Sequence, residues 1–158
     1  MQPAVSGWFA QQSPFEFATK RFEPARSARR FESGTPPIPN VYFARAGLKL
    51  LQEIGLENVR EQIRRLTRRL MDGAHELGIR IKTPDDSVGP LVVLQAKDAA
   101  ALVSLLAKDS VLCSCRHDGL RISFHVYNNV EDVDLVLRAL EKHRDLLVTE
   151  TRATSASR

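Results

Sequence analysis

The chain has 158 residues, 43% of them hydrophobic, which allows one core and a further extended segment. No run approaches the roughly 20 consecutive apolar residues of a membrane span, and no secretory signal is visible. We therefore expect a soluble, cytoplasmic protein with no membrane partner. Arginine supplies 17 of the 23 basic residues behind the net charge of +4. Five of them share one expected helix without interleaved aromatic residues, so we favour a solvated helix face and expect no nucleic-acid partner.

Residues 1–40 differ from the rest of the chain. They contain six of the eight prolines and five of the seven phenylalanines, and they have no periodic run long enough for a helix. An irregular segment this apolar normally packs on something. We expect an extended arm over 1–40 that forms an interface with another domain or a partner subunit.

Two helices are expected next. Apolar residues at helical spacing predict the first from residue 41 to residue 54, before Gly55, and the second from 56 to 77, before Gly78. The second pattern is the more regular, because its apolar positions step by three or four residues throughout.

From Gly78 the pattern changes to short strands, expected over residues 79–82, 91–95, 111–116 and 120–126, with a helix over 97–107. Asp118-Gly119 is typical of a hairpin turn, so the last two strands should pair antiparallel. Asn129 should cap a final helix, and residues 149–158 should form a disordered tail. The order predicts an α+β domain over 41–148, in which helices cover one face of a small antiparallel sheet.

Two sites could bind an anionic ligand. Gly34-Thr35, ahead of two prolines, offers backbone N–H groups and a hydroxyl that suit a phosphate, although a simple turn would have the same sequence. Arg121 alternates with Leu120 and Ile122, so it should project from the opposite face and could bind a carboxylate; a surface ion pair is the alternative.

Other reactive residues give weaker indications. His117 and His125 have no partners at metal-ligand spacing, so we expect no metal site. Cys113 and Cys115 should be reduced thiols, because a disulfide between residues two apart on a strand would be strained. Trp8 could stack on a ring or fill a gap in the core.

Four stretches in this order carry a family resemblance: Gly7-Trp8-Phe9, Arg30 to Pro37, Leu120 to His125, and Tyr127 to Asp134. Together they resemble the C-terminal portion of fold-type-I, class V pyridoxal-phosphate enzymes, the group of kynureninases, epimerase-like proteins, cysteine desulfurases and several aminotransferases. The resemblance implies the cofactor pyridoxal 5′-phosphate (PLP), an amino-acid substrate and a homodimer. It also implies that Gly34 and Thr35 bind the phosphate of the partner subunit's cofactor, and that Arg121 and Trp8 lie at the substrate.

The resemblance also shows what the chain lacks. Enzymes of this group form a Schiff base through a lysine of their large domain, and none of the six lysines here lies in a matching context. We therefore expect no catalytic residue in this chain and inactivity on its own. By the same resemblance, a desulfurase needs a long, mobile loop that carries a cysteine between the last two strands. The connection here, residues 117–119, is a tight turn, which disfavours desulfurase chemistry without excluding it, because Cys115 lies nearby. We therefore favour transamination, lyase or epimerase reactions. A non-catalytic dimerisation or binding module, or half of a split enzyme, is the alternative.

Overall fold

The computed structural model describes residues 1–150 except 2, 19 and 88, and the chain divides into two compact units, Met1–Leu50 and Leu51–Arg158. Most of the expected disordered tail, residues 151–158, lies outside the described residues. Within the described part, no helix is both long and apolar enough to cross a membrane.

The first unit is built from short turns of 3-10 helix: η1 (Trp8–Ala10), η2 (Pro14–Glu16) and η3 (Ala28–Phe31). It also contains most of helix α1 (Ile38–Ile54), which begins at Ile38 and therefore before the predicted start at residue 41. Pro39 can lie in the first turn because the N–H that it lacks would have no partner there. None of the described residues of α1 is buried.

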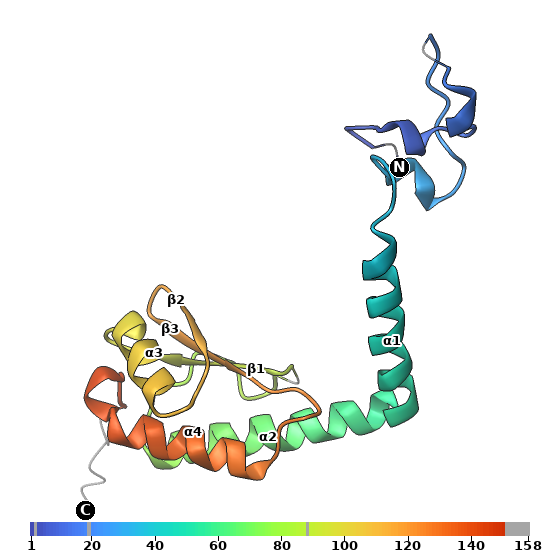
Figure 1. Ribbon diagram of the computed structural model, residues 1–158. Coiled ribbons are helices and arrows are strands. Elements are labelled where there is room, and N and C mark those ends of the chain that lie inside the picture. Colours follow the sequence, from blue (N-terminus) through green and yellow to red (C-terminus); the bar gives the residue numbers. More distant parts are fainter. Residues whose placement is uncertain (2, 19, 88, 151–158) are drawn as a thin grey trace, which may run out of the picture. The chain divides into compact units, whose positions relative to one another are not determined.

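The second unit has its core between one face of a sheet and the helices that cover it. Helix α2 (Leu56–Glu76) buries one apolar stripe that includes Leu66 and Leu70, as its spacing predicts. Helix α4 (Val130–Lys142) lies along α2 (Figure 1), and the Arg69 guanidinium on α2 forms a 2.7 Å ion pair with Asp134 on α4.

Among the described residues, three strands form the antiparallel sheet in the order β1-β3-β2: β1 (Leu91–Gln95), β2 (Ser114–Arg116) and β3 (Gly119–Ser123). Burial alternates along β1 and β3, so one face packs on the core and the other stays open. Helix α3 (Ala99–Lys108) contacts β2 and β3. The predicted α+β class, with helices on one face of a small antiparallel sheet, is confirmed.

The predicted strands are longer than those observed. Residues 79–82 form only isolated bridges, Ile79 with Thr149 and Ile81 with Leu94, and residues 111–113 have no bridge in the described structure. The chain remains paired after the short turn η4 (Arg144–Leu146). Thr149 forms the bridge with Ile79, and the Glu150 N–H donates a hydrogen bond to the Gly78 carbonyl. Leu147, in this C-terminal segment, is completely buried.

Candidate functional site

In the first unit, two stretches that are far apart in the sequence meet. A Cβ added to Gly7 would lie 1.7 Å from the Ser33 carbonyl oxygen, so only glycine allows the two backbones to approach this closely. Next to this contact, the indole Nε1 of Trp8 is 3.7 Å from the position of a Cβ on Gly34. The structure thus brings Trp8 and Gly34 together.

Arg29, which the sequence did not single out, holds this arrangement. Its Nη2 donates hydrogen bonds to the Gln11 and Gln12 carbonyl oxygens, at 3.0 and 2.7 Å, and so fastens η3 to the segment that follows η1. The Ala25 N–H donates to the Ala10 carbonyl at 2.8 Å, and both alanines are buried. Arg29 lies one residue before the recognised Arg30-Phe31 stretch, which is the only sequence signal that could have identified it.

Trp8 lies at the surface of an aromatic cluster. Its ring is stacked on Phe17 at a centroid distance of 6.1 Å and meets Phe9 edge to face at 4.3 Å. The side chain remains 42% exposed, so it is a partly covered aromatic surface and does not fill a core. Of the two interpretations of Trp8, the structure therefore excludes the core one within this unit.

The loop at Gly34-Thr35 presents open hydrogen-bond donors. Among the described residues, no acceptor binds the N–H groups of Gly34 and Thr35 or the Thr35 hydroxyl, and Thr35 is exposed. Pro36 and Pro37 follow and restrict the backbone. Two adjacent N–H donors and a hydroxyl can donate to the oxygens of one phosphate group.

Arg121 lies in the second unit, at the centre of the sheet. It occupies β3, between Val93 on β1 and Ser114 on β2, on the open face opposite the buried Leu120 and Ile122. The side chain is half-buried, and its guanidinium has no hydrogen-bond or ion-pair partner within the part of the chain that the structure describes. The predicted orientation is confirmed, and the alternative of a surface ion pair is not observed among these residues.

The strand that carries Arg121 is fixed at both ends. At its start, the Asp118 carboxylate accepts hydrogen bonds from Lys82 Nζ at 2.6 Å and from Gln95 Nε2 at 2.9 Å. The ammonium group of Lys82 holds the pKa of the Asp118 carboxyl below its ordinary value. A Cβ on Gly119 would lie 2.9 Å from Val93, so the hairpin packs directly on β1.

At the other end, the Asn128 side chain closes the turn from β3 into α4. Its Oδ1 accepts from the His125 N–H at 2.9 Å, and its Nδ2 donates to Asp132 at 3.0 Å. Asn129 and Asp132 form a capping box at the start of α4. The hydrogen bonds from Asn128 and then from the Asn129 N–H lower the pKa of Asp132. Asn128 of the Tyr127-Asn128 motif thus has a structural explanation.

Packing determines the environments of Cys113 and His125. Burial, and then the neighbouring Cys115, raise the pKa of the Cys113 thiol, which disfavours a nucleophilic thiolate. His125 stacks on Tyr127 at 5.0 Å, and the described residues contain no cluster that could hold a metal ion. The β2–β3 connection consists of His117 and Asp118 alone, so there is no room here for a long loop.

Comparison with solved structures shows the class of this fold. The chain is similar to the cysteine desulfurase CsdA from Escherichia coli, with a TM-score of 0.77 over 94% of this chain and 40% of that one, at 23% sequence identity. A cysteine desulfurase from Thermococcus onnurineus gives a TM-score of 0.75 at 22% identity and covers 89% of this chain and 38% of that one. The chain therefore has the fold of about two fifths of each of these two proteins.

Residues 15–136 match the aminotransferase class-V family, and the chain belongs to that family. It is 31% identical over 134 residues to the uncharacterized aminotransferase YcbU of Bacillus subtilis, over 84% of this chain and 35% of the relative. It is 26% identical over 149 residues to a kynureninase of Geobacillus thermodenitrificans, over 89% of this chain and 35% of that protein. The chain thus spans about a third of the length of these relatives.

The aminotransferases, kynureninases and desulfurases of this family depend on PLP. The groups that this chain leaves open fit such a cofactor and an amino acid: N–H and hydroxyl donors suit a phosphate, and a guanidinium suits a carboxylate. The matched range contains Gly34, Thr35 and Arg121, whereas Trp8 precedes it. Of the lysines, Lys82, Lys97 and Lys142 donate hydrogen bonds within the second unit.

Proposed function

We propose that this chain forms the substrate-carboxylate and cofactor-phosphate contacts of a PLP-dependent enzyme that acts on an amino acid. The observation that carries the proposal is the open guanidinium of Arg121 on the central strand of the sheet. This side chain is half-buried, and its guanidinium pairs with no group in the described part of the chain, so its donors are available to a ligand. A ligand carboxylate would accept two parallel hydrogen bonds from this guanidinium.

The second contact is at Gly34-Thr35. Their N–H groups and the Thr35 hydroxyl would donate to phosphate oxygens, and Pro36 and Pro37 would limit the entropy lost when the loop is fixed. PLP, when bound, supplies the electron sink for breaking a bond to the Cα of an amino acid. Trp8, whose indole lies beside Gly34, would cover this end of the site and exclude water. In the homodimer that the family resemblance implies, the phosphate would belong to the partner subunit's cofactor.

The reactive lysine would come from outside this chain. Three of its six lysines are engaged in the hydrogen bonds named above, and none of the six resembles the family's lysine in sequence context. The chain alone would then bind ligands without turning them over. Because a two-residue turn replaces a long cysteine-bearing loop, we favour transamination, lyase or epimerase chemistry over desulfuration. We expect this activity in the cytoplasm, where both thiols stay reduced.

A second candidate function is assembly, favoured by the exposed apolar surface of the first unit. Phe15 and Phe17 are 71% and 68% exposed, and the exposed face of α1 includes Tyr42 and Phe43. A monomer rarely leaves so many large apolar side chains in water. We propose that this surface packs on the remainder of the enzyme or on a second subunit. Light scattering tests packing on a second subunit, which a strictly monomeric chain at high concentration would contradict.

Ligand titration of the isotopically labelled chain tests the carboxylate contact. L-alanine should shift the Arg121 side-chain resonance, and L-alanine methyl ester, which has no carboxylate, should not. Arg121→Gln should abolish the binding, and Arg121→Lys should weaken it because an ammonium group cannot form the bidentate pair. Arg116→Gln is the matched control, since Arg116 lies on the neighbouring strand and donates to the Cys115 carbonyl.

Two results would contradict this assignment: equal binding of the ester, or equal loss of binding in the Arg116 variant. The phosphate contact is tested separately by titration with PLP, which should shift the Gly34 and Thr35 amide resonances. Thr35→Val, which removes the hydroxyl and keeps the shape, should reduce these shifts. Shifts confined to lysine side chains would indicate non-specific adduct formation and would contradict the role of the loop.

A further inference from the structure

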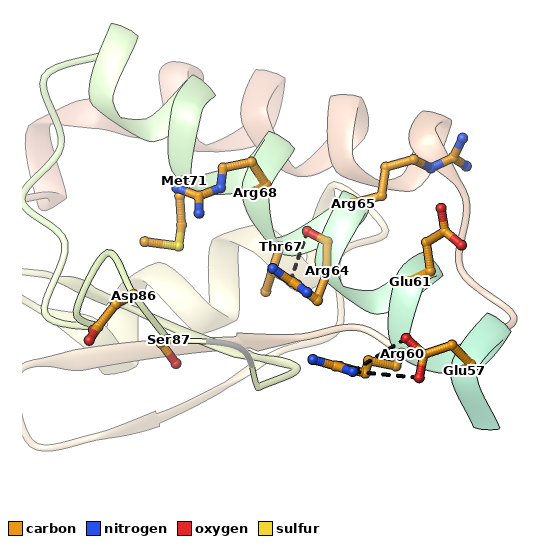
Figure 2. Close-up of a pocket in the computed structure, with 10 residues that line it drawn as sticks. All are labelled: Glu57, Arg60, Glu61, Arg64, Arg65, Thr67, Arg68, Met71, Asp86 and Ser87. Carbon is orange, nitrogen blue, oxygen red and sulfur yellow. Dashed lines mark hydrogen bonds and ion pairs between the residues drawn. The ribbon is translucent and has the colours of Figure 1, made fainter.

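A hollow of about 590 Å³ lies along α2, on the side that faces the loop before β1. Figure 2 shows its walls: four arginines of α2 on one side, with Asp86 and Ser87 on the other. None of the residues assigned above to the carboxylate and phosphate contacts lines it. The sequence pattern favoured a solvated helix face for these arginines. The structure shows that this face borders a hollow.

Three of the arginines form a row. Arg60, Arg64 and Arg68 are four residues apart, so they repeat along one side of the helix at steps of about 6 Å. In Figure 2 their guanidinium groups point toward the side on which Asp86 and Ser87 lie, whereas Arg65 points away from that loop. The row therefore presents three positive charges over about 12 Å along one wall of the hollow.

These charges are poorly compensated within the chain. Arg60 contacts the Glu57 carboxylate at 3.3 Å, and both side chains are more than half exposed, so the pair is weak. Arg64 and Arg68 have no carboxylate partner among the described residues. Like charges four residues apart on a helix repel one another. An anionic ligand along the row would relieve this repulsion.

The shape and the lining distinguish between anions. A straight row of cations fits an extended polyanion better than a compact one such as a single phosphate. Carboxylates at Glu57 and Asp86 border the row and would repel a nucleic acid, which carries a charge at every nucleotide. The hollow has no aromatic lining on which bases could stack. Glu61 also lines the hollow. A polypeptide of mixed charge can place acids at the arginines and donors at these three carboxylates.

We propose that the row Arg60, Arg64 and Arg68 binds an acidic helical segment of a partner protein. Carboxylates four residues apart on a helix repeat at the same step of about 6 Å as the three guanidiniums. Each pairs with one arginine through charge-assisted hydrogen bonds. The Ser87 hydroxyl on the opposite wall is a further donor to the segment.

Fluorescence anisotropy with the full 158-residue chain tests the proposal. The probe is a labelled alanine-rich helical peptide with glutamates at positions i, i+4 and i+8, and its isomer has the same glutamates distributed around the helix. The first peptide should bind more tightly, and both Arg64→Gln and Arg68→Gln should weaken it about fivefold, the range of one exposed ion pair. Arg138→Gln is the control, because Arg138 is an exposed arginine of α4 outside the hollow.

Several outcomes would overturn the proposal. Equal affinity for the two peptides would mean that the spacing of the arginines does not contribute to peptide recognition. Equal weakening by the Arg138 variant would indicate non-specific attraction to a basic protein. Tighter binding of single-stranded RNA or polyphosphate than of the peptide would assign the row to a phosphate polyanion. No binding at 20 mM salt, where exposed charges are screened least, would refute a binding role for this row.

Discussion

Replacing Gly7 with alanine should separate the two stretches that meet in the first unit. Gly7 has φ −104° and ψ 176°, an extended conformation open to any residue, so the effect should come from space alone. The new Cβ would lie 1.7 Å from the Ser33 carbonyl oxygen. Ordinary carbon–oxygen contacts are about 3.3 Å, so the two backbones must move apart by roughly 1.6 Å. Such overpacking costs about 1–3 kcal/mol.

Tryptophan fluorescence measures this change, because Trp8 is the only tryptophan of the chain. In Gly7→Ala, separation from Gly34 should shift the emission to longer wavelength and increase quenching by acrylamide. Gly34→Ala is the control, since its Cβ would lie 3.7 Å from the Trp8 indole nitrogen, an ordinary contact. If Gly7→Ala has the emission and quenching of the wild type, the close approach of Gly7 and Ser33 is wrong.

Three further predictions concern stability, measured as the free energy of unfolding in urea. Leu66→Ala should lower it by about 2–5 kcal/mol, because the side chain is completely buried; a loss below 1 kcal/mol would contradict its place in the core. Asn129→Ala should cost about 1 kcal/mol through the lost α4 cap, and Asn129→Thr should restore most of it. Hydrogen bonds from Lys142 and then His143 lower the pKa of Asp109, so its contribution should be present above about pH 3.9 and disappear as the pH falls through the lower folded pKa. Asp109→Asn should therefore be less stable than the wild type at pH 6, and the difference should shrink as the pH falls through the folded pKa of Asp109.

Local patterns were sufficient to predict the helices and the hairpin of the second unit. The spacing of Leu66 and Leu70 defined the buried face of α2, and Asp118-Gly119 located the hairpin. Alternation along one strand placed Arg121 opposite Leu120. These features depend on neighbours within a few residues, where the periods of helix and strand leave little choice.

Non-local contacts could not be predicted. The segment around Leu147 pairs with chain near residues 79 and 96, and nothing in its short sequence indicates those partners. The contact between Gly7 and Ser33 joins two irregular stretches, for which no periodicity exists to reveal a face. Residues 111–113 have strand-like composition, yet the ladder with β3 stops at Ser114 and leaves Leu112 90% exposed. The composition of a segment indicates that it can form a strand. It does not decide how many of its residues pair with a neighbouring strand.

The central position of Arg121 in the sheet limits how far its backbone can move when a ligand binds. Its backbone is bonded to strands on both sides, and Asp118 and Asn128 fasten the strand at its two ends. The Cα of Arg121 therefore cannot move independently of the sheet. Only the side-chain torsions of Arg121 can adjust to a ligand. Most of the ordering entropy of this contact is already lost when the chain folds, so binding need only restrict one side chain. If Arg121 binds a carboxylate as proposed, the sheet would therefore fix the distance of that carboxylate from the strand.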